Sequence, residues 1–235
     1  MRAETAPARI GILGGAGPFA SAVFQVRLVQ AWARQMSGAC LQDEHYPAII
    51  HLSEALQGLG ADGVECRRRA AASLARGVSL LKEAGAAFVA APCNSLGEVL
   101  TNCTGTLGLE VFTPWNSAPA MRQPASTAVL CSKSMRAYLS ARYPELIFPS
   151  DAAQAAVQLL IEQGMAGQAP SACLLQALIS EQLRRGVAEV RIACTELSCA
   201  QLEPDERVLD TMNCLVRATA DRAQALFRAS FQAST

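Results

Sequence analysis

The stretch Ala91-Pro92-Cys93-Asn94-Ser95 ends an apolar, strand-like run, and Ala193-Cys194-Thr195-Glu196-Leu197 ends a second one. In both stretches a cysteine follows the run, and a small polar residue follows the cysteine. A glycine, Gly85 or Gly186, precedes each cysteine at the same distance. The repetition predicts two similar half-domains, each with a thiol at the end of a strand.

Helical and strand-like stretches alternate around these two motifs, which predicts an α/β fold with mainly parallel strands. We expect strands at 9–13, 47–52, 86–91, 127–131, 187–193 and 207–209, with another near 146–148. Helices are expected at 18–36, 62–84, 151–164, 171–185 and 211–231. The predicted architecture is two similar lobes, each a mainly parallel sheet flanked by helices, with the active site in the cleft between them.

Turn-rich breaks at Thr113-Pro114 and at 123–126 suggest where the second half starts. The N-terminal lobe, with Cys93, is expected to comprise residues 1–112 and 211–235. The C-terminal lobe, with Cys194, is expected to comprise residues 113–210.

Composition excludes several classes of protein. The chain has 235 residues, 51% of them hydrophobic, and a net charge of zero, so it offers no electrostatic basis for binding nucleic acid or an anionic membrane. No apolar run is long enough to span a bilayer and no secretion signal is visible, so we expect a cytoplasmic protein. Nine cysteines, an odd number without C-x-x-C spacing, and two histidines predict neither a disulfide framework nor a metal site.

The paired cysteines carry the predicted chemistry. Asn94 and Thr195 are candidate N-caps of following helices, and a helix N-terminus lowers the pKa of a thiol. Two such groups on opposite sides of one carbon can invert it, because one thiolate removes a proton and the other thiol delivers one. The alternative is that both are buried core cysteines.

Three segments resemble motifs of the aspartate/glutamate racemase family, the cofactor-independent two-cysteine amino-acid racemases. Ile10–Pro18 resembles the opening G-G-M-G-P loop, Pro92-Cys93-Asn94-Ser95 resembles P-C-N-T, and Ala193–Leu197 resembles G-C-T-E-L. The resemblance implies Cys93 and Cys194 as the catalytic acid/base pair. It also implies no cofactor, a small-molecule amino-acid substrate and a homodimer.

The same resemblance implies which residues surround the substrate. They are Gly15 and Ala16 in the glycine loop, Asn94, Ser95, Thr195 and Glu196 beside the cysteines, and Ser132 and Lys133 at a strand end. Ser132 matches a family hydroxyl position. Lys133 either meets a substrate carboxylate or is a solvated surface lysine, and Glu196 is expected to hold the loop after Cys194.

The chain departs from the family at three positions. Leu52–Leu56 lacks the arginine usual in aspartate-specific members, and Gln154–Val157 lacks the expected lysine. The histidine that often follows P-C-N-T is replaced within Ser95-Leu96-Gly97. The substrate therefore stays open between aspartate, glutamate and another amino acid.

Other functions are compatible with parts of the sequence. Gly15–Ala20 fits the G-x-G-x-x-A dinucleotide fingerprint, with Glu54 as a candidate ribose ligand, which would suit a nucleotide-binding oxidoreductase. The missing cations suggest a racemase-like binding protein that has lost turnover. A cysteine hydrolase needs a base beside the thiol, and neither cysteine motif contains a histidine.

Overall fold

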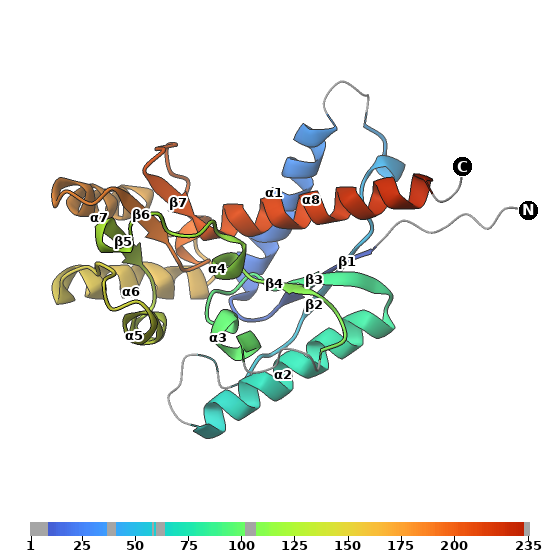
Figure 1. Ribbon diagram of the computed structural model, residues 1–235, viewed down its shortest axis with the longest axis horizontal. Coiled ribbons are helices and arrows are strands. Elements are labelled where there is room, and N and C mark those ends of the chain that lie inside the picture. The colour runs from blue at the N-terminus through green and yellow to red at the C-terminus, as the bar shows by residue number, and fades with distance from the viewer. Residues whose placement is uncertain (1–8, 37–40, 58, 60–63, 102–106, 233–235) are drawn as a thin grey trace, which may run out of the picture.

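The chain forms two parallel sheets flanked by helices, which confirms the predicted α/β class (Figure 1). The computed structural model describes residues 9–36, 41–57, 59, 64–101 and 107–232. Among them, no helix is both long enough and apolar enough to cross a membrane.

The first sheet has the strand order β2-β1-β3-β4, with every pair parallel. Its strands are β1 (Arg9–Gly14), β2 (Ile49–Ser53), β3 (Ala86–Ala90) and β4 (Val111–Phe112). Apolar residues on both faces of β1 and β3 are buried, as expected for strands that helices cover on two sides.

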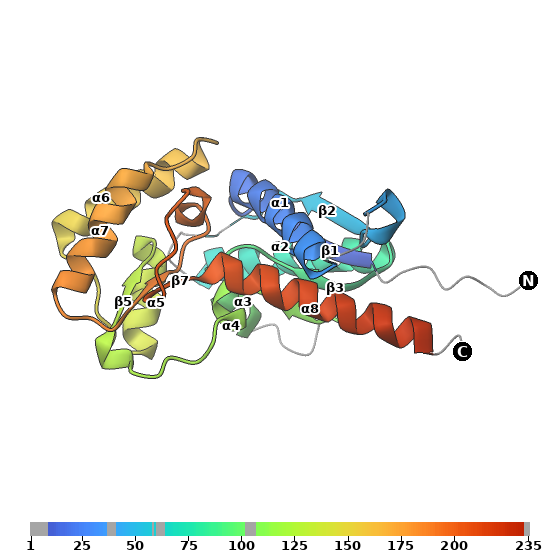
Figure 2. The same cartoon turned by 90° about the horizontal axis from the view of Figure 1, so that it is seen from above.

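Three long helices cover this sheet: α1 (Pro18–Gln35), α2 (Val64–Glu83) and α8 (Thr211–Gln232). Phe24 and Leu28 of α1 pack with Met212 and Leu215 of α8 in one core cluster against β1 and β3. Leu74, Val78 and Leu81 of α2 pack on the opposite face. The last helix thus belongs to the core of the first sheet, although it follows the second sheet in the chain (Figure 2).

The second sheet has the order β5-β6-β7, also parallel, from β5 (Thr127–Leu130), β6 (Glu189–Ile192) and β7 (Val208–Asp210). The helices α6 (Asp151–Met165) and α7 (Ala172–Arg184) pack on one face of it. On the other face lies α5 (Lys133–Arg142).

Short elements lead into and out of the sheets. They are α3 (Leu96–Thr101), α4 (Pro114–Ser117) and three 3-10 turns, η1 (Asp43–His45), η2 (Pro124–Ser126) and η3 (Leu197–Cys199). The turn η3 directly follows the Cys194 motif, and α3 follows the Cys93 motif.

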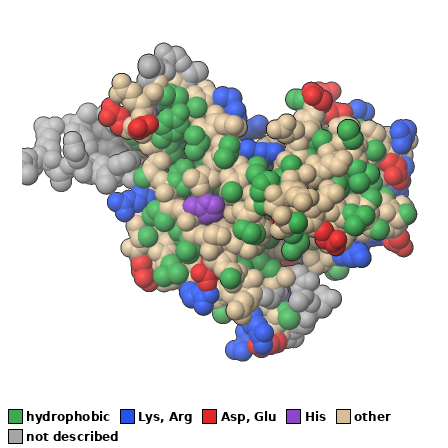
Figure 3. All heavy atoms as spheres, turned by 180° about the vertical axis from the view of Figure 1, so that it is seen from behind, with side chains coloured by type: hydrophobic (Ala, Val, Ile, Leu, Met, Phe, Trp, Pro, Cys, Tyr) green, Lys and Arg blue, Asp and Glu red, His purple; other side chains and the backbone are tan. Residues whose placement is uncertain are grey.

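The expected long helices are present within two residues at each described end, and residues 62 and 63 lie outside the described part. The strand expected near 146–148 is wrong, because Ile147 makes a single isolated bridge to Ala128 instead of a ladder. Acidic and basic side chains are interspersed on the face shown in Figure 3, without an extended region of one sign, in agreement with the net charge of zero.

Candidate active site

Both cysteine motifs lie just beyond the carboxyl ends of parallel strands. Cys93 follows β3, and Cys194 follows β6. Because Leu130 of β5 pairs with Ile192 of β6, Ser132 and Cys194 leave neighbouring strands at the same edge of the second sheet. Such edges are the usual location of ligand sites in open α/β sheets.

Glu196 is the polar partner of Cys194. The Cys194 thiol donates to Glu196 Oε2 at 3.0 Å, and the Thr195 hydroxyl donates to the same oxygen at 3.4 Å. Glu196 occupies space that two glycines leave open: a Cβ on Gly17 would overlap its Oε1, and a Cβ on Gly164 would lie 2.6 Å from its Cβ. The Glu196 side chain therefore packs the Cys194 turn against the glycine loop through its carboxylate and against α6 through its Cβ.

Cys93 is half-buried at the start of α3. The backbone N–H groups of Leu96 and Ser95 and the Ser95 hydroxyl hydrogen-bond to its sulfur. Burial and the nearby Glu196 carboxylate nevertheless raise the pKa of Cys93 to about 12. Ser95 thus lies where the sequence analysis expected it, beside the first thiol.

The pKa of Cys194 is also raised well above its ordinary value, by burial first, then by Glu196, and further by Cys93. Glu196 lies close enough to influence both thiols, and Cys93 lies close enough to influence Cys194. The expectation that helix dipoles hold these thiols as thiolates is wrong, because desolvation and the Glu196 carboxylate outweigh the hydrogen bonds to the two sulfurs.

The two predicted helix N-caps, Asn94 and Thr195, are also wrong. The helix α3 begins at Leu96, so the capping position falls to Ser95, and Asn94 Oδ1 instead accepts from the Thr211 hydroxyl at 3.2 Å. After Cys194 comes a three-residue 3-10 turn with Glu196 at its cap position and no side-chain cap bond. A turn of that length has little dipole to stabilise a thiolate.

Ser132 and Lys133 begin α5. Ser132 caps this helix, because its hydroxyl oxygen accepts from the Met135 N–H at 3.2 Å. Lys133 is exposed, and its ammonium is not among the groups that shift the pKa of either catalytic candidate. The structure therefore favours the surface-lysine interpretation of Lys133.

The glycine loop is tightly packed against its surroundings. Gly15 has a φ of 100°, and a Cβ there would overlap the Glu54 carbonyl oxygen. The Glu54 carboxylate forms an ion pair with Arg76. Since the carboxylate of Glu196 lies beside Gly17 at the start of α1, it takes the place where a dinucleotide phosphate would bind. Both features disfavour the nucleotide-binding alternative.

Gly15→Ala is expected to destabilise the fold by about 2–4 kcal/mol, because an L side chain is strained at this φ and would collide with backbone. Urea unfolding followed by circular dichroism measures the change. Ala16→Ser, a polar change at the adjacent position, is the control and should cost about 1 kcal/mol or less. An unchanged midpoint for Gly15→Ala would contradict the close packing of this loop.

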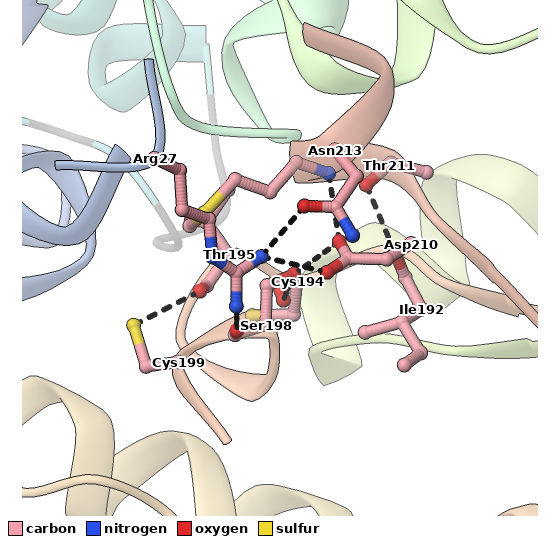
Figure 4. A network of polar contacts seen from close by, with 10 residues as sticks. Arg27, Ile192, Cys194, Thr195, Ser198, Cys199, Asp210, Thr211 and Asn213 are labelled. Atoms are coloured by element: carbon pink, nitrogen blue, oxygen red, sulfur yellow. Dashed lines mark hydrogen bonds and ion pairs between the residues drawn. The ribbon is translucent and has the colours of Figure 1, made fainter. Parts of the chain in front are cut away.

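A polar network on the far side of the Cys194 turn was not predicted. Figure 4 shows the Arg27 guanidinium of α1 pointing toward Asp210, Asn213 and the Ser198 backbone. Its Nη1 donates to Asp210 Oδ2 at 3.0 Å and to Asn213 Oδ1 at 2.9 Å, and its Nη2 donates to the Ser198 carbonyl. The Ser198 hydroxyl contacts Asp210 Oδ1 at 2.6 Å and the Cys194 carbonyl at 3.3 Å.

This network joins α1, which covers the first sheet, to the turn that carries the second thiol. Its members come from α1, from η3 and from the junction of β7 with α8. The arrangement fixes Cys194 relative to the first sheet, and hence relative to Cys93.

Among the described residues, no group of three or more His, Cys, Asp and Glu side chains is arranged to hold a metal ion. The polar groups around the thiols are instead hydroxyls, amides, backbone N–H groups and one carboxylate. This set suits a small polar molecule.

Replacing Glu196 by glutamine is expected to increase alkylation of Cys93 by iodoacetamide about 3- to 10-fold at pH 8. The neutral amide no longer raises the pKa of this thiol, so a larger fraction is thiolate. Mass spectrometry of labelled peptides measures the rate, with the exposed Cys173 as internal control. An unchanged rate at Cys93 would contradict electrostatic control by Glu196.

The raised pKa also predicts how stability depends on pH. Below about pH 9 the Cys93 thiol is neutral in both the folded and the unfolded protein. As the pH rises from 9 toward 12 the unfolded thiol ionises first, so the folded state loses stability over that window.

Comparisons with known proteins find a similar fold in solved racemase structures. No family model and no curated protein sequence matches the chain. Solved structures do, among them a proposed Asp/Glu racemase from Yersinia pestis, at 20% identity and a TM-score of 0.62, covering 92% of this chain and 99% of that one. An aspartate racemase homologue from Pyrococcus horikoshii OT3 matches at 15% identity and a TM-score of 0.65, covering 92% of this chain and 99% of that one.

An allantoin racemase from Klebsiella pneumoniae matches at 11% identity and a TM-score of 0.53, covering 93% of this chain and 88% of that one. At such identities the likeness is one of fold. The chain has the two-sheet fold of the aspartate/glutamate racemases, as its three sequence motifs predicted.

Proposed function

We propose that the chain is a cofactor-independent amino-acid racemase that inverts the α-carbon by proton transfer between Cys93 and Cys194. The observation that supports this most directly is that each parallel sheet has one thiol just beyond the carboxyl end of a strand. The Glu196 carboxylate lies close enough to raise the pKa of both thiols. The racemase and isomerase folds of the solved neighbours support the same reaction class.

The proposed reaction begins with both thiols protonated, because their pKa values are raised. Glu196 Oε2, at 3.0 Å, is placed to accept the proton of Cys194 and leave a thiolate. A thiolate whose conjugate acid has a raised pKa is a stronger base toward a weakly acidic C–H bond.

In one direction, the Cys194 thiolate takes the α-proton and the electron pair of that C–H bond moves into the substrate carboxylate. Cys93 then delivers its proton to the opposite face, so that the α-carbon is inverted and Cys93 becomes the thiolate. The Ser95 hydroxyl and the Ser95 and Leu96 N–H groups stabilise that thiolate. The reverse reaction exchanges the two roles.

The deciding experiment incubates the purified chain with L- and D-amino acids in D₂O. Loss of the α-proton signal in NMR, together with loss of optical rotation, is the expected result for at least one amino acid. Absence of both with a broad panel would refute the racemase function.

A second candidate is a racemase-like binding protein without turnover. The raised pKa of both thiols favours it, since neither thiol is a thiolate at neutral pH before a ligand binds. Binding of an amino acid in calorimetry without any α-proton exchange would identify this case. A homodimer and a cytoplasmic location stay predictions.

A further inference from the structure

We propose that this site takes α-amino acids whose side chains are uncharged and donate a hydrogen bond, and that it discriminates against aspartate and glutamate. The inference rests on the racemase function proposed above and specifies its substrate class.

The first observation is a buried carboxylate without an ion pair. Glu196 is 9% exposed, and its Oε2 accepts hydrogen bonds from the Cys194 thiol and the Thr195 hydroxyl. No ion pair among the described residues includes it. A buried carboxylate is stabilised when a cation reaches it, and the α-ammonium group of an amino acid is such a cation.

The second observation is where the cationic side chains lie. Arg27 is engaged by Asp210, Asn213 and a backbone carbonyl, and Lys133 is exposed. Arg136 lies near Asp151 and over the ring of Phe148.

Arg191 is buried in the middle of β6, where it pairs with Glu189 and lies over the ring of Trp115. Outside the described part of the chain, Arg2 is the one Lys or Arg. A substrate with a second carboxylate would therefore add negative charge beside the Glu196–Cys194 pair, which carries one negative charge whichever of the two holds the proton. No described arginine or lysine is among the groups that shift the pKa of Cys93 or Cys194, so none lies close enough to offset that charge.

The third observation is an acceptor that lacks a donor. Gln154, at the start of α6, is 4% exposed, and its Nε2 donates to the Cys131 carbonyl at 2.9 Å. Because a carbonyl oxygen can only accept, the side-chain atom that contacts it must be the Gln154 nitrogen and not its oxygen. Gln154 Oε1 is the remaining end, and it is buried without a hydrogen-bond partner.

Gln154 is held at the edge of the sheet that carries Cys194. Cys131 directly follows β5, which pairs with β6. Asn94 Nδ2, beside Cys93, is likewise buried and unpartnered, and it can donate to the substrate α-carboxylate without a formal charge. A carboxamide or hydroxyl on the substrate side chain would supply the donor that Gln154 Oε1 lacks.

The test uses the full chain in D₂O with asparagine, glutamine, serine, alanine, aspartate and glutamate, each as both enantiomers. The expected kcat/KM for the best uncharged polar substrate exceeds that for aspartate and glutamate by at least about 10-fold. An equal or higher value for aspartate or glutamate overturns the substrate-class proposal while the racemase function stands.

Two variants of Gln154 test the role of its amide. Gln154→Met, similar in size but without the amide, should lower kcat/KM for asparagine about 10-fold and leave alanine within about 2-fold, since alanine has no side-chain donor. An equal loss for both substrates overturns the proposed contact. Thermal melts confirm that the variant is folded.

Gln154→Lys should raise the ratio of aspartate to asparagine activity at least about 10-fold, because it introduces a cation at this edge. Gln158→Lys, one turn further along α6, adds the same charge elsewhere and should not change the ratio. Lys133→Ala addresses the rival explanation: selective loss of aspartate activity would show that Lys133 is the missing cation, and would overturn the proposal.

If no amino acid exchanges its α-proton, calorimetry with the same panel tests the proposed ligand class separately from the proposed racemase function. Binding of asparagine at least about 10-fold tighter than aspartate supports the ligand class and refutes turnover. Equal binding, or none, overturns both.

Discussion

Cys93→Ser and Cys194→Ser are each expected to lower racemisation by at least about 1,000-fold, the largest effect among the substitutions considered. A serine hydroxyl is far too weakly acidic to supply a proton-transfer base at neutral pH. Each variant keeps the thiol on one side of the substrate, so exchange of the α-proton without inversion survives for one enantiomer. The surviving enantiomer differs between the two variants.

The measurement combines deuterium incorporation by NMR with polarimetry, using both enantiomers of the best substrate. Cys173→Ser is the matched control, because Cys173 is an exposed thiol and should leave the rate within about 2-fold. Full racemisation by either active-site variant would remove that thiol from the mechanism. Loss of exchange for the same enantiomer in both would contradict thiols that act from opposite sides.

Arg27→Gln is expected to lower kcat about 10- to 100-fold with little change in KM, and to reduce the free energy of unfolding by about 1–3 kcal/mol. The guanidinium and the Asp210 carboxylate are largely buried, with 23% and 15% of their side chains exposed. Losing Arg27 leaves Asp210 and the Ser198 carbonyl with fewer partners and frees the turn that carries Cys194. Misplacement of a reacting group lowers kcat more than it weakens substrate binding.

Steady-state kinetics and urea unfolding measure the two effects separately. Arg34→Gln, an exposed arginine on the same helix, is the control for charge and helix propensity. Arg27→Ala should recover part of its kcat in added guanidinium, which a purely structural loss would not allow. A destabilised Arg27→Gln protein with unchanged kcat would restrict Arg27 to a structural role.

The predictable part of the fold lies in its long, uniform segments. The apolar runs before Cys93 and Cys194 became β3 and β6, and the amphipathic stretch at 62–84 became α2. The apolar residues at 146–148 misled the prediction, because Leu146 and Phe148 pack in a core cluster while Ile147 makes a single bridge. The helix α5 was missed, although the Ser132 cap was a visible signal.

The positions of the two cysteines were predictable, and their electrostatics were not. The sequence predicted a cysteine after each of two strands, and these strands are β3 and β6, but the direction of the thiol pKa shifts depends on burial and on where the Glu196 carboxylate lies in the fold. Arg27 could not be found from local pattern, since its partners are more than 170 positions away in the chain. A single arginine on an amphipathic helix carries no local signal of such a contact.

The return of α8 to the first sheet has a consequence for how the protein is made. Met212, Leu215, Val216 and Ala220 complete the same core cluster as Ile10 and Phe24, so a ribosome must synthesise nearly the whole chain before that core can close. The strands and helices between residues 127 and 210 form a sheet from one continuous stretch and are complete earlier. During synthesis, the apolar face of β1 and α1 therefore stays exposed until α8 has been made, whereas the second sheet can already assemble.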